Sequence, residues 1–135
     1  MVRRGKMYFA AVIMIVIITI AFAVFASGPD VVNTEFLESY GWRVEEHYIE
    51  CEDIIIPKPF DLVYERYNEL QLEAGLDLTE YMGCRGKRYT YVVENYPEDV
   101  GEEVRANVLC IDGKPVGGDI MTVSVNGFMK SLKRE

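Results

Sequence analysis

The longest hydrophobic stretch of the chain runs from Met7 to Ala26 and contains no charged residue. Its polar side chains are Tyr8 and Thr19. A helix rises about 1.5 Å per residue, so a helix over this stretch would be about 30 Å long, which matches the hydrocarbon core of a bilayer. The pattern therefore predicts a transmembrane helix, an uncleaved signal anchor, over residues 7–26.

Charged residues lie unevenly around this stretch. The basic residues that precede it are Arg3, Arg4 and Lys6. The first acidic residue, Asp30, follows it. Because basic flanks stay on the cytoplasmic side, we expect residues 1–6 to form a cytoplasmic tail and the C-terminal domain to lie outside. The prediction is a single-pass protein of the cell membrane, with membrane lipid contacted through Met7 to Ala26.

A cleaved secretory signal is the alternative, with cleavage near Ala26 and release of the domain. The hydrophobic region of a signal peptide usually has about 7–15 residues. The stretch here is longer, which favours the uncleaved anchor. Both alternatives place the rest of the chain on the same side of the membrane.

Residues 27–33 are expected to form a linker, because Gly28 and Pro29 interrupt a helix. Residues 34–135 then make one extracytoplasmic domain of ordinary size. Its first element is a short helix that Asn33 or Thr34 caps and that Gly41 ends in the left-handed conformation. The apolar face of this helix consists of Phe36, Leu37 and Tyr40.

The main helix of the domain is predicted from Phe60 to Ala74, with Gly75 as its C-terminal stop. Apolar side chains recur along it at helical spacing, whereas acidic and basic residues fill the opposite side. The predicted buried face consists of Phe60, Val63, Tyr64, Tyr67, Leu70 and Ala74.

Alternating apolar and polar positions predict the strands. The alternation changes part-way between Trp42 and Ile56, which indicates a bulge or two short strands. A meander of three antiparallel strands follows over residues 87–96, 103–111 and 114–125. Asp112 and Gly113 join the last two strands in a two-residue hairpin. Gly117 to Asp119 interrupts the last strand, and Asn126-Gly127 leads into a short C-terminal helix over residues 128–133.

These elements predict the α+β class. The expected domain has an antiparallel sheet, made of the three-stranded C-terminal meander plus an N-terminal strand. One main helix and short flanking helices pack on this sheet.

All 22 Asp and Glu residues lie from Asp30 onward, together with 11 of the 14 Lys and Arg residues. The region after the hydrophobic stretch therefore carries a net charge of −11. A domain this acidic is repelled by nucleic acid, which we exclude as a partner, and it attracts cations or a basic partner.

The sequence contains no motif that carries a reaction. Gly117-Gly118-Asp119-Ile120 is similar to the GGDEF signature of cyclic-dinucleotide synthases but lacks the Glu-Phe pair, so we interpret it as a place where another backbone or ring approaches the strand. Asp119 is then expected to point inward and bond to Arg88 or to backbone N–H groups. The lone His47 has no ligand spacing and is expected at the surface. We predict no catalytic residue, no cofactor and no metal.

Three cysteines, Cys51, Cys84 and Cys110, are an odd number without a Cys-x-x-Cys pair. One disulfide is possible, but the spacing does not assign it. Cys110, inside an apolar run, is typical of a buried small residue.

The chain contains nine tyrosines. Some of them could line a groove for a peptide or glycan, or they fill the core with their hydroxyls at its rim. Asn68 and Gln71 flank the main helix and are expected to hold the loop after it. The candidate interaction or structural polar positions are Asn68, Gln71, Tyr81, Tyr91 and Asp119.

Separated motifs between about Glu35 and Leu132 carry a family resemblance. The first set is Ile56-Pro57, Phe60, Tyr64, Tyr67-Asn68, Leu70-Gln71, Gly75, Asp77-Leu78, Tyr81 and Gly83. The second set is Arg88-Tyr89-Thr90-Tyr91, Asn95-Tyr96-Pro97, Gly117-Gly118-Asp119 and Gly127-Phe128-Met129. The chain resembles a domain-of-unknown-function family of small membrane-anchored or secreted proteins from Gram-positive bacteria. The resemblance implies the compartment and the α+β domain but no activity, and Cys84 departs from the expected pattern.

The function that we predict is a non-enzymatic binding or accessory module of the cell envelope, with an envelope protein or ligand as its partner. The alternative is a small secreted or envelope hydrolase that uses Asp and Glu carboxylates. A pocket with converging carboxylates would favour the enzyme, and a groove or flat aromatic patch would favour the binding module.

Overall fold

The computed structural model describes residues 2–26 and 28–135, with side chains over residues 4–19 and 28–135. Its helices are α1 (Val2–Ala26), α2 (Pro29–Ser39) and α3 (Leu62–Glu73), with a 3₁₀ turn η1 (Leu78–Tyr81). Its strands are β1 (Glu50–Ile55), β2 (Arg85–Val92), β3 (Val104–Ile111), β4 (Lys114–Thr122) and β5 (Met129–Lys130). The five strands form one antiparallel sheet in the order β1-β2-β3-β4-β5. The α+β class and the antiparallel meander are thus confirmed.

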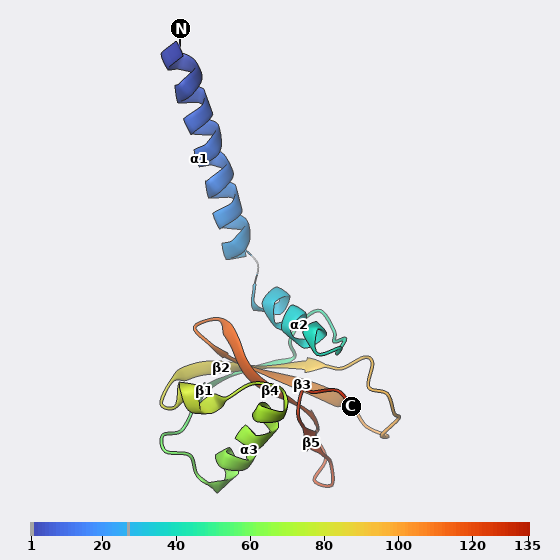
Figure 1. The fold of residues 1–135 in the computed structure, drawn as a ribbon. Helices are drawn as coiled ribbons and strands as arrows, with labels where there is room; N and C mark the ends of the chain where they lie inside the picture. Colours follow the sequence, from blue (N-terminus) through green and yellow to red (C-terminus); the bar gives the residue numbers. More distant parts are fainter. Residues whose placement is uncertain (1, 27) are drawn as a thin grey trace.

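Helices α2 and α3 lie on opposite faces of this sheet (Figure 1). The side chains of the central strand β3 alternate between the two faces. Ala106 and Val108 pack on the α2 side with Leu37, whereas Leu109 packs on the α3 side with Leu78. Each helix therefore covers its own small apolar core.

The hairpin between β3 and β4 turns through Asp112 and Gly113 as predicted. Their φ angles are +49° and +73°, and positive φ at both central residues is the requirement of a type I′ turn. The register of the two strands shifts between Leu109 and Cys110, where β4 contains one extra residue. Strand β4 nevertheless runs unbroken through Gly117 to Asp119, so the predicted interruption there is wrong.

The predicted linker over residues 27–33 is wrong from Pro29 onward, because α2 begins there. Proline suits the first turn of a helix, since it has no N–H to leave unpaired. Asn33, expected as a cap, lies inside α2 and is buried. Gly41 ends this region with φ +89°, as its predicted role as a left-handed stop requires.

The prediction of a transmembrane helix over residues 7–26 is contradicted. In the part of the chain that the structure describes, no helix combines the length and the apolarity needed to cross a membrane. The side chains of residues 20–26 lie outside the described part. The predicted single-pass localisation and the cytoplasmic tail over residues 1–6 lose their basis with this helix.

Two local predictions also fail. The C-terminal segment pairs with β4 as the short strand β5 and does not form the predicted helix over residues 128–133. The region from Trp42 to Ile56 contributes only β1 and an isolated bridge between Val44 and Val93. The change of alternation in that region therefore marks the loop before β1.

Strand β1 forms one edge of the sheet, and its acidic side chains face basic partners on the neighbouring strands. Lys87 lies 3.8 Å from Asp53, and Arg105 lies 3.4 Å from Glu50. Arg88 forms a further ion pair with Glu52. These pairs are largely exposed, so each contributes little to the stability of the fold.

Candidate functional site

A groove, here called the α3 groove, runs between α3 and the sheet face that α3 covers. Its volume is about 570 Å³, within the about 300–1,000 Å³ that is typical of small-molecule sites. Helix α3 supplies its wall, and each of the five strands supplies at least one side chain to its floor. Its aliphatic and thioether side chains are Ile54, Val63, Leu70, Leu109, Met121 and Met129. Its other side chains are Tyr64, Arg66, Tyr67, Glu69, Arg88, Asn107 and Asp119.

Two side chains position α3: Asp61 caps its first turn, and the buried amide of Gln71 attaches it to the sheet. Asp61 caps the helix, because its carboxylate accepts a hydrogen bond from the Tyr64 N–H at 2.8 Å. Gln71, fully buried, donates to the carbonyl of Gly118 at 2.9 Å and accepts from its N–H at 2.8 Å. A Cβ on Gly117 would lie 2.9 Å from the Gln71 Oε1. The glycine pair thus lets the helix amide reach the strand backbone.

Asn68 holds the loop that follows α3. Its carbonyl oxygen accepts from the Leu78 N–H at 2.7 Å, and its Nδ2 donates to Asp77 at 3.0 Å. Hydrogen bonds from Thr79 and Asn68 lower the pKa of Asp77. The loop therefore packs Leu78 into the core beneath α3.

A chain of polar side chains crosses the floor of the α3 groove. The Tyr67 hydroxyl donates to Asp119 Oδ2 at 2.6 Å, and Asn107 Nδ2 donates to Asp119 Oδ1 at 3.0 Å. The Thr90 hydroxyl donates to Asn107 Oδ1 at 2.6 Å. Asn107, Asp119 and Thr90 are all buried. These hydrogen bonds fix the orientation of the Asp119 carboxylate.

Burial has the largest effect on the pKa values of Asp119 and Tyr67 in this hydrogen-bonded series. It raises the pKa of Asp119, even though the hydrogen bonds from Tyr67 and Asn107 and the charge of Arg88 act in the opposite direction. Burial and the charge of Asp119 also raise the pKa of Tyr67 well above its usual range. The Tyr67 hydroxyl therefore keeps its proton and remains a donor to Asp119.

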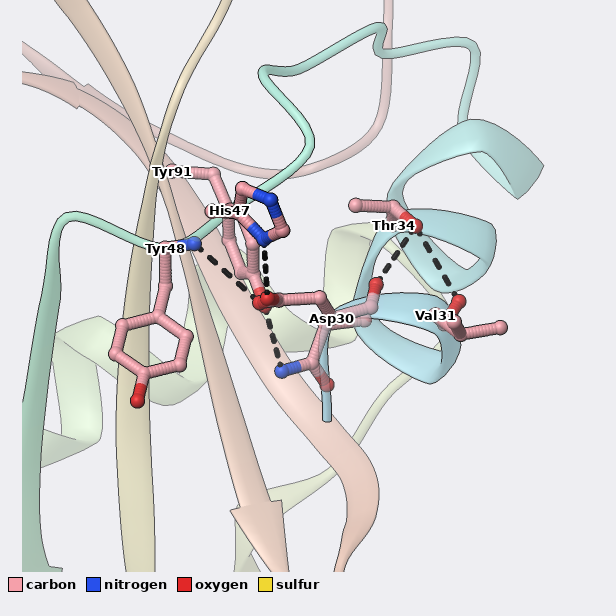
Figure 2. A network of polar contacts seen from close by, with 7 residues as sticks. Asp30, Val31, Thr34, His47, Tyr48 and Tyr91 are labelled. Atoms are coloured by element: carbon pink, nitrogen blue, oxygen red, sulfur yellow. Dashed lines mark hydrogen bonds and ion pairs between the residues drawn. The ribbon is translucent and has the colours of Figure 1, made fainter. Parts of the chain in front are cut away.

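A second polar network ties α2 to the opposite face of the sheet. Figure 2 shows Asp30 pointing from the first turn of α2 toward His47, Tyr48 and Tyr91. Asp30 Oδ1 accepts from the Tyr91 hydroxyl at 2.7 Å and from the Tyr48 N–H at 3.3 Å, and Asp30 Oδ2 lies 3.1 Å from His47 Nδ1. Asn33 Nδ2 donates to the Tyr91 oxygen at 3.1 Å.

This second network lowers the pKa of its acid and raises the pKa of its base, and both shifts favour the charged forms. Burial alone would raise the pKa of Asp30, but the hydrogen bonds from Tyr91, His47 and Tyr48 outweigh it and hold the pKa below its usual value. The hydrogen bond to Asp30 raises the pKa of His47, aided by the charge of Glu46. The network joins the first two turns of α2 to β2 and to the loop before β1, so we interpret it as the set of contacts that holds α2 on the sheet.

Cysteine chemistry adds no site in the described residues, where all three cysteines are unpaired. Cys110 is buried as predicted, and its Sγ lies 3.2 Å from Asn33 Oδ1. Burial raises the pKa of Cys110 to about 11, which leaves it a thiol at neutral pH. Within the described part of the chain, no group of three acidic, histidine or cysteine side chains is arranged to hold a metal ion.

A smaller cavity of about 370 Å³ lies beside Trp42, under the C-terminal segment. The Arg134 guanidinium lies 4.9 Å from the centre of the Trp42 ring, and the Trp42 indole N–H donates to the Leu132 carbonyl at 2.7 Å. The chain's own C-terminal residues thus occupy the aromatic surface here. The α3 groove, which is larger and lined mainly by apolar side chains, is the better candidate for a ligand.

The structure separates the predicted polar positions. Asp119 lines the α3 groove. Gln71 and Asn68 do not line it, and they attach α3 to the backbone of β4 and to the loop after the helix. Tyr91 belongs to the network on the other face, and Tyr81 packs against the core near Leu78.

Sequence reasoning missed several side chains of the groove, and Asn107 is the clearest case. It stands on a strand whose neighbours on the same face, Arg105 and Leu109, suggest an exposed surface. Its partners Thr90 and Asp119 lie on the two flanking strands. The available signal was that three polar side chains occupy paired positions on the same face of three adjacent strands in the predicted meander. Asp30 and His47 offered no such signal, because the loop before β1 has no regular register.

The fold and the groove define a small α+β domain with a ligand-sized groove between α3 and the sheet. The chain belongs to the family described as a domain of unknown function (DUF4830), whose family model matches residues 36–120. The predicted resemblance to a domain-of-unknown-function family is thereby confirmed, whereas the match shows neither membrane anchoring nor a Gram-positive origin. Comparisons with curated proteins and with solved structures find no significant match.

Proposed function

We propose that the domain is a non-enzymatic binding module and that the α3 groove takes a small, largely apolar ligand. The observation that carries the proposal is the combination of an open groove of about 570 Å³, aliphatic and thioether walls, and a fixed polar centre at Asp119. Ligand sites typically combine an apolar lining with a few convergent polar groups in this way.

The exposure of the groove's apolar side chains supports a ligand at this place. Val63 was expected in the core, but its side chain is 73 % exposed, and Met129 is 49 % exposed. Both line the groove. A ligand that covered them would remove apolar surface from water and gain about 25 cal/mol per Å².

Hydrolysis by carboxylates is the second candidate, because Asp119 and Glu69 both line the groove and burial raises the pKa of Asp119. A raised carboxyl pKa in a cleft is one mark of a catalytic acid. Binding is favoured over it because both oxygens of Asp119 accept hydrogen bonds from Tyr67 and Asn107, which favour the carboxylate over the protonated form that a catalytic acid needs. Cleavage of a chromogenic glycoside by the full chain, lost in Glu69→Gln, would favour the hydrolase instead.

The test compares two neighbouring exposed positions on α3. Val63 lines the groove, whereas Leu62, 63 % exposed, does not. The neutral fluorescent probe N-phenyl-1-naphthylamine is titrated into the full chain and into the variants Val63→Trp and Leu62→Trp. We expect Val63→Trp to fill the groove and abolish the groove-specific part of the signal, with Leu62→Trp behaving like the original chain. Equal binding by all three proteins would overturn the proposal.

A further inference from the structure

The α3 groove contains a buried carboxylate without a counter-charge in direct contact. Asp119 is 1 % exposed. Among the residues that the structure describes, no lysine, arginine or histidine forms an ion pair with it. Its two contacts, from Tyr67 and Asn107, come from neutral donors. A buried carboxylate held only by neutral donors is costly to keep ionised.

Arg88 is the groove's basic side chain on the sheet, and it is engaged elsewhere. Its guanidinium pairs with Glu52 on β1. It influences Asp119 through its charge and makes no hydrogen bond to it. The carboxylate of Asp119 has room for further donors, because two oxygens offer about four lone-pair positions and the two neutral donors use two of them.

The surroundings of Asp119 select the rest of the ligand. Side chains of Leu70, Leu109 and Met121 line the groove with it, so the body of a ligand beside this carboxylate meets apolar surface. The chain carries a net charge of −8, and a field of this sign raises the local concentration of cations around the domain.

We infer that the ligand of the α3 groove is a small organic cation, an ammonium on an apolar body, whose ammonium group donates hydrogen bonds to Asp119. This inference rests on the proposed function and adds the chemical class of the ligand. The ammonium supplies a counter-charge in direct contact with Asp119, which no described basic side chain provides, and the apolar body covers the aliphatic side chains. A hydrogen bond between two charged groups is stronger than one between neutral groups, so the amine outcompetes a neutral molecule of the same shape.

The experiment uses a pair of probes that differ only in this group, 2-phenylethylamine and 2-phenylethanol. Each is titrated into the full chain near neutral pH by isothermal calorimetry. We expect the amine to bind about tenfold more tightly than the alcohol, since a charge-assisted hydrogen bond contributes at least a factor of this size. Asp119→Asn should reduce the two affinities to the same value. Glu65→Gln, which removes an exposed acid of α3 outside the groove, is the matched control and should keep the preference.

A second variant keeps the test decisive if Asp119→Asn does not fold. Arg88→Gln removes a positive charge from the groove that repels an ammonium, so the affinity of the amine should rise relative to that of the alcohol. Equal affinities of the two probes for the original chain, or a preference for the amine that survives in Asp119→Asn, would overturn the inference that the ligand is a cation. The proposal that the groove binds an apolar ligand would not be affected. Failure of both probes to bind, or binding that Val63→Trp does not reduce, would overturn the proposed function together with it.

Discussion

The hydroxyl of Tyr91 donates a hydrogen bond to Asp30 Oδ1 over 2.7 Å and links residues that are 61 positions apart. The oxygen of the Tyr91 hydroxyl in turn accepts a hydrogen bond from Asn33 Nδ2. One phenol on β2 thus holds the first two turns of α2. Tyr91 and Asn33 are buried, so no water replaces a lost partner without a rearrangement.

Tyr91→Phe should destabilise the domain by about 1–3 kcal/mol, because it leaves the buried Asn33 amide without its acceptor and Asp30 without a donor. Urea denaturation followed by circular dichroism measures the change. Tyr89→Phe is the matched control, since Tyr89 lies on the same face of β2 but is half-buried. An equal loss in both variants would show that the hydroxyl of Tyr91 has no special part in holding α2.

The pair of Asp30 and His47 predicts a pH dependence of stability. The pKa of His47 is raised in the folded protein by its hydrogen bond to Asp30, so the folded state holds the proton more tightly than the unfolded state. The stabilisation is fully present below the unfolded pKa, about 6.5, and is lost as the pH rises through the higher folded value. The lowered pKa of Asp30 limits the window on the acidic side, where stability falls as this carboxylate becomes protonated.

Urea midpoints at about pH 5.5 and about pH 8.5 check this sign, since they bracket the ordinary pKa of histidine. His47→Gln removes the titrating group at an exposed position. We expect the original chain to be more stable than the variant at the lower pH and to lose that advantage at the higher one. A difference that stays constant between the two pH values would exclude the pair as a source of pH dependence.

Gly113→Val should destabilise the domain by about 1 kcal/mol or more, because a β-branched residue resists positive φ. Gly113 has φ +73°, and a Cβ there would meet no atom within 4 Å. The cost is therefore purely one of backbone conformation. Gly113→Asn is the control, since asparagine tolerates the left-handed region. Equal unfolding midpoints for the two variants would contradict the type I′ turn.

Two leucines on the α3 side of the sheet allow a core position to be compared with a groove position. Leu78 is fully buried, whereas Leu70 is partly exposed and lines the groove. Leu78→Ala should cost about 2–5 kcal/mol and leave a cavity, and Leu70→Ala should cost clearly less. The reverse order in urea denaturation would place the main apolar contact of the helix at Leu70.

The sequence predicts the parts of this fold that local patterns determine. The alternation of β3, the Asp112–Gly113 turn and the stop of α3 at Gly75, with φ +77°, each depend on neighbouring residues only. Val63 shows the limit of such patterns. It falls on the apolar stripe of α3, but it lines the groove and stays 73 % exposed, so the spacing that predicts burial does not bury it.

The candidate site was predictable only in part for a related reason. Asp119 points inward as expected, but side chains of Tyr67 and Asn107 bond to it in place of the expected Arg88 or backbone N–H groups. The choice among these partners depends on strand register and on where α3 crosses the sheet. Both arise from contacts between residues far apart in the sequence, and the pattern of a single chain does not encode them locally.

The acidic edge strand β1 has a consequence for encounters between copies of the chain. An edge strand offers unpaired backbone groups to any other strand, and this is a common start of aggregation. Here the edge carries Glu50, Glu52 and Asp53, each with a side chain more than half exposed. Two copies that approached each other along β1 would bring the same rows of carboxylates together, and like charges across paired strands repel. The charge of β1 thus opposes pairing of this strand with a second copy. This protection against aggregation weakens in acid or at high salt, where the carboxylates are neutralised or screened.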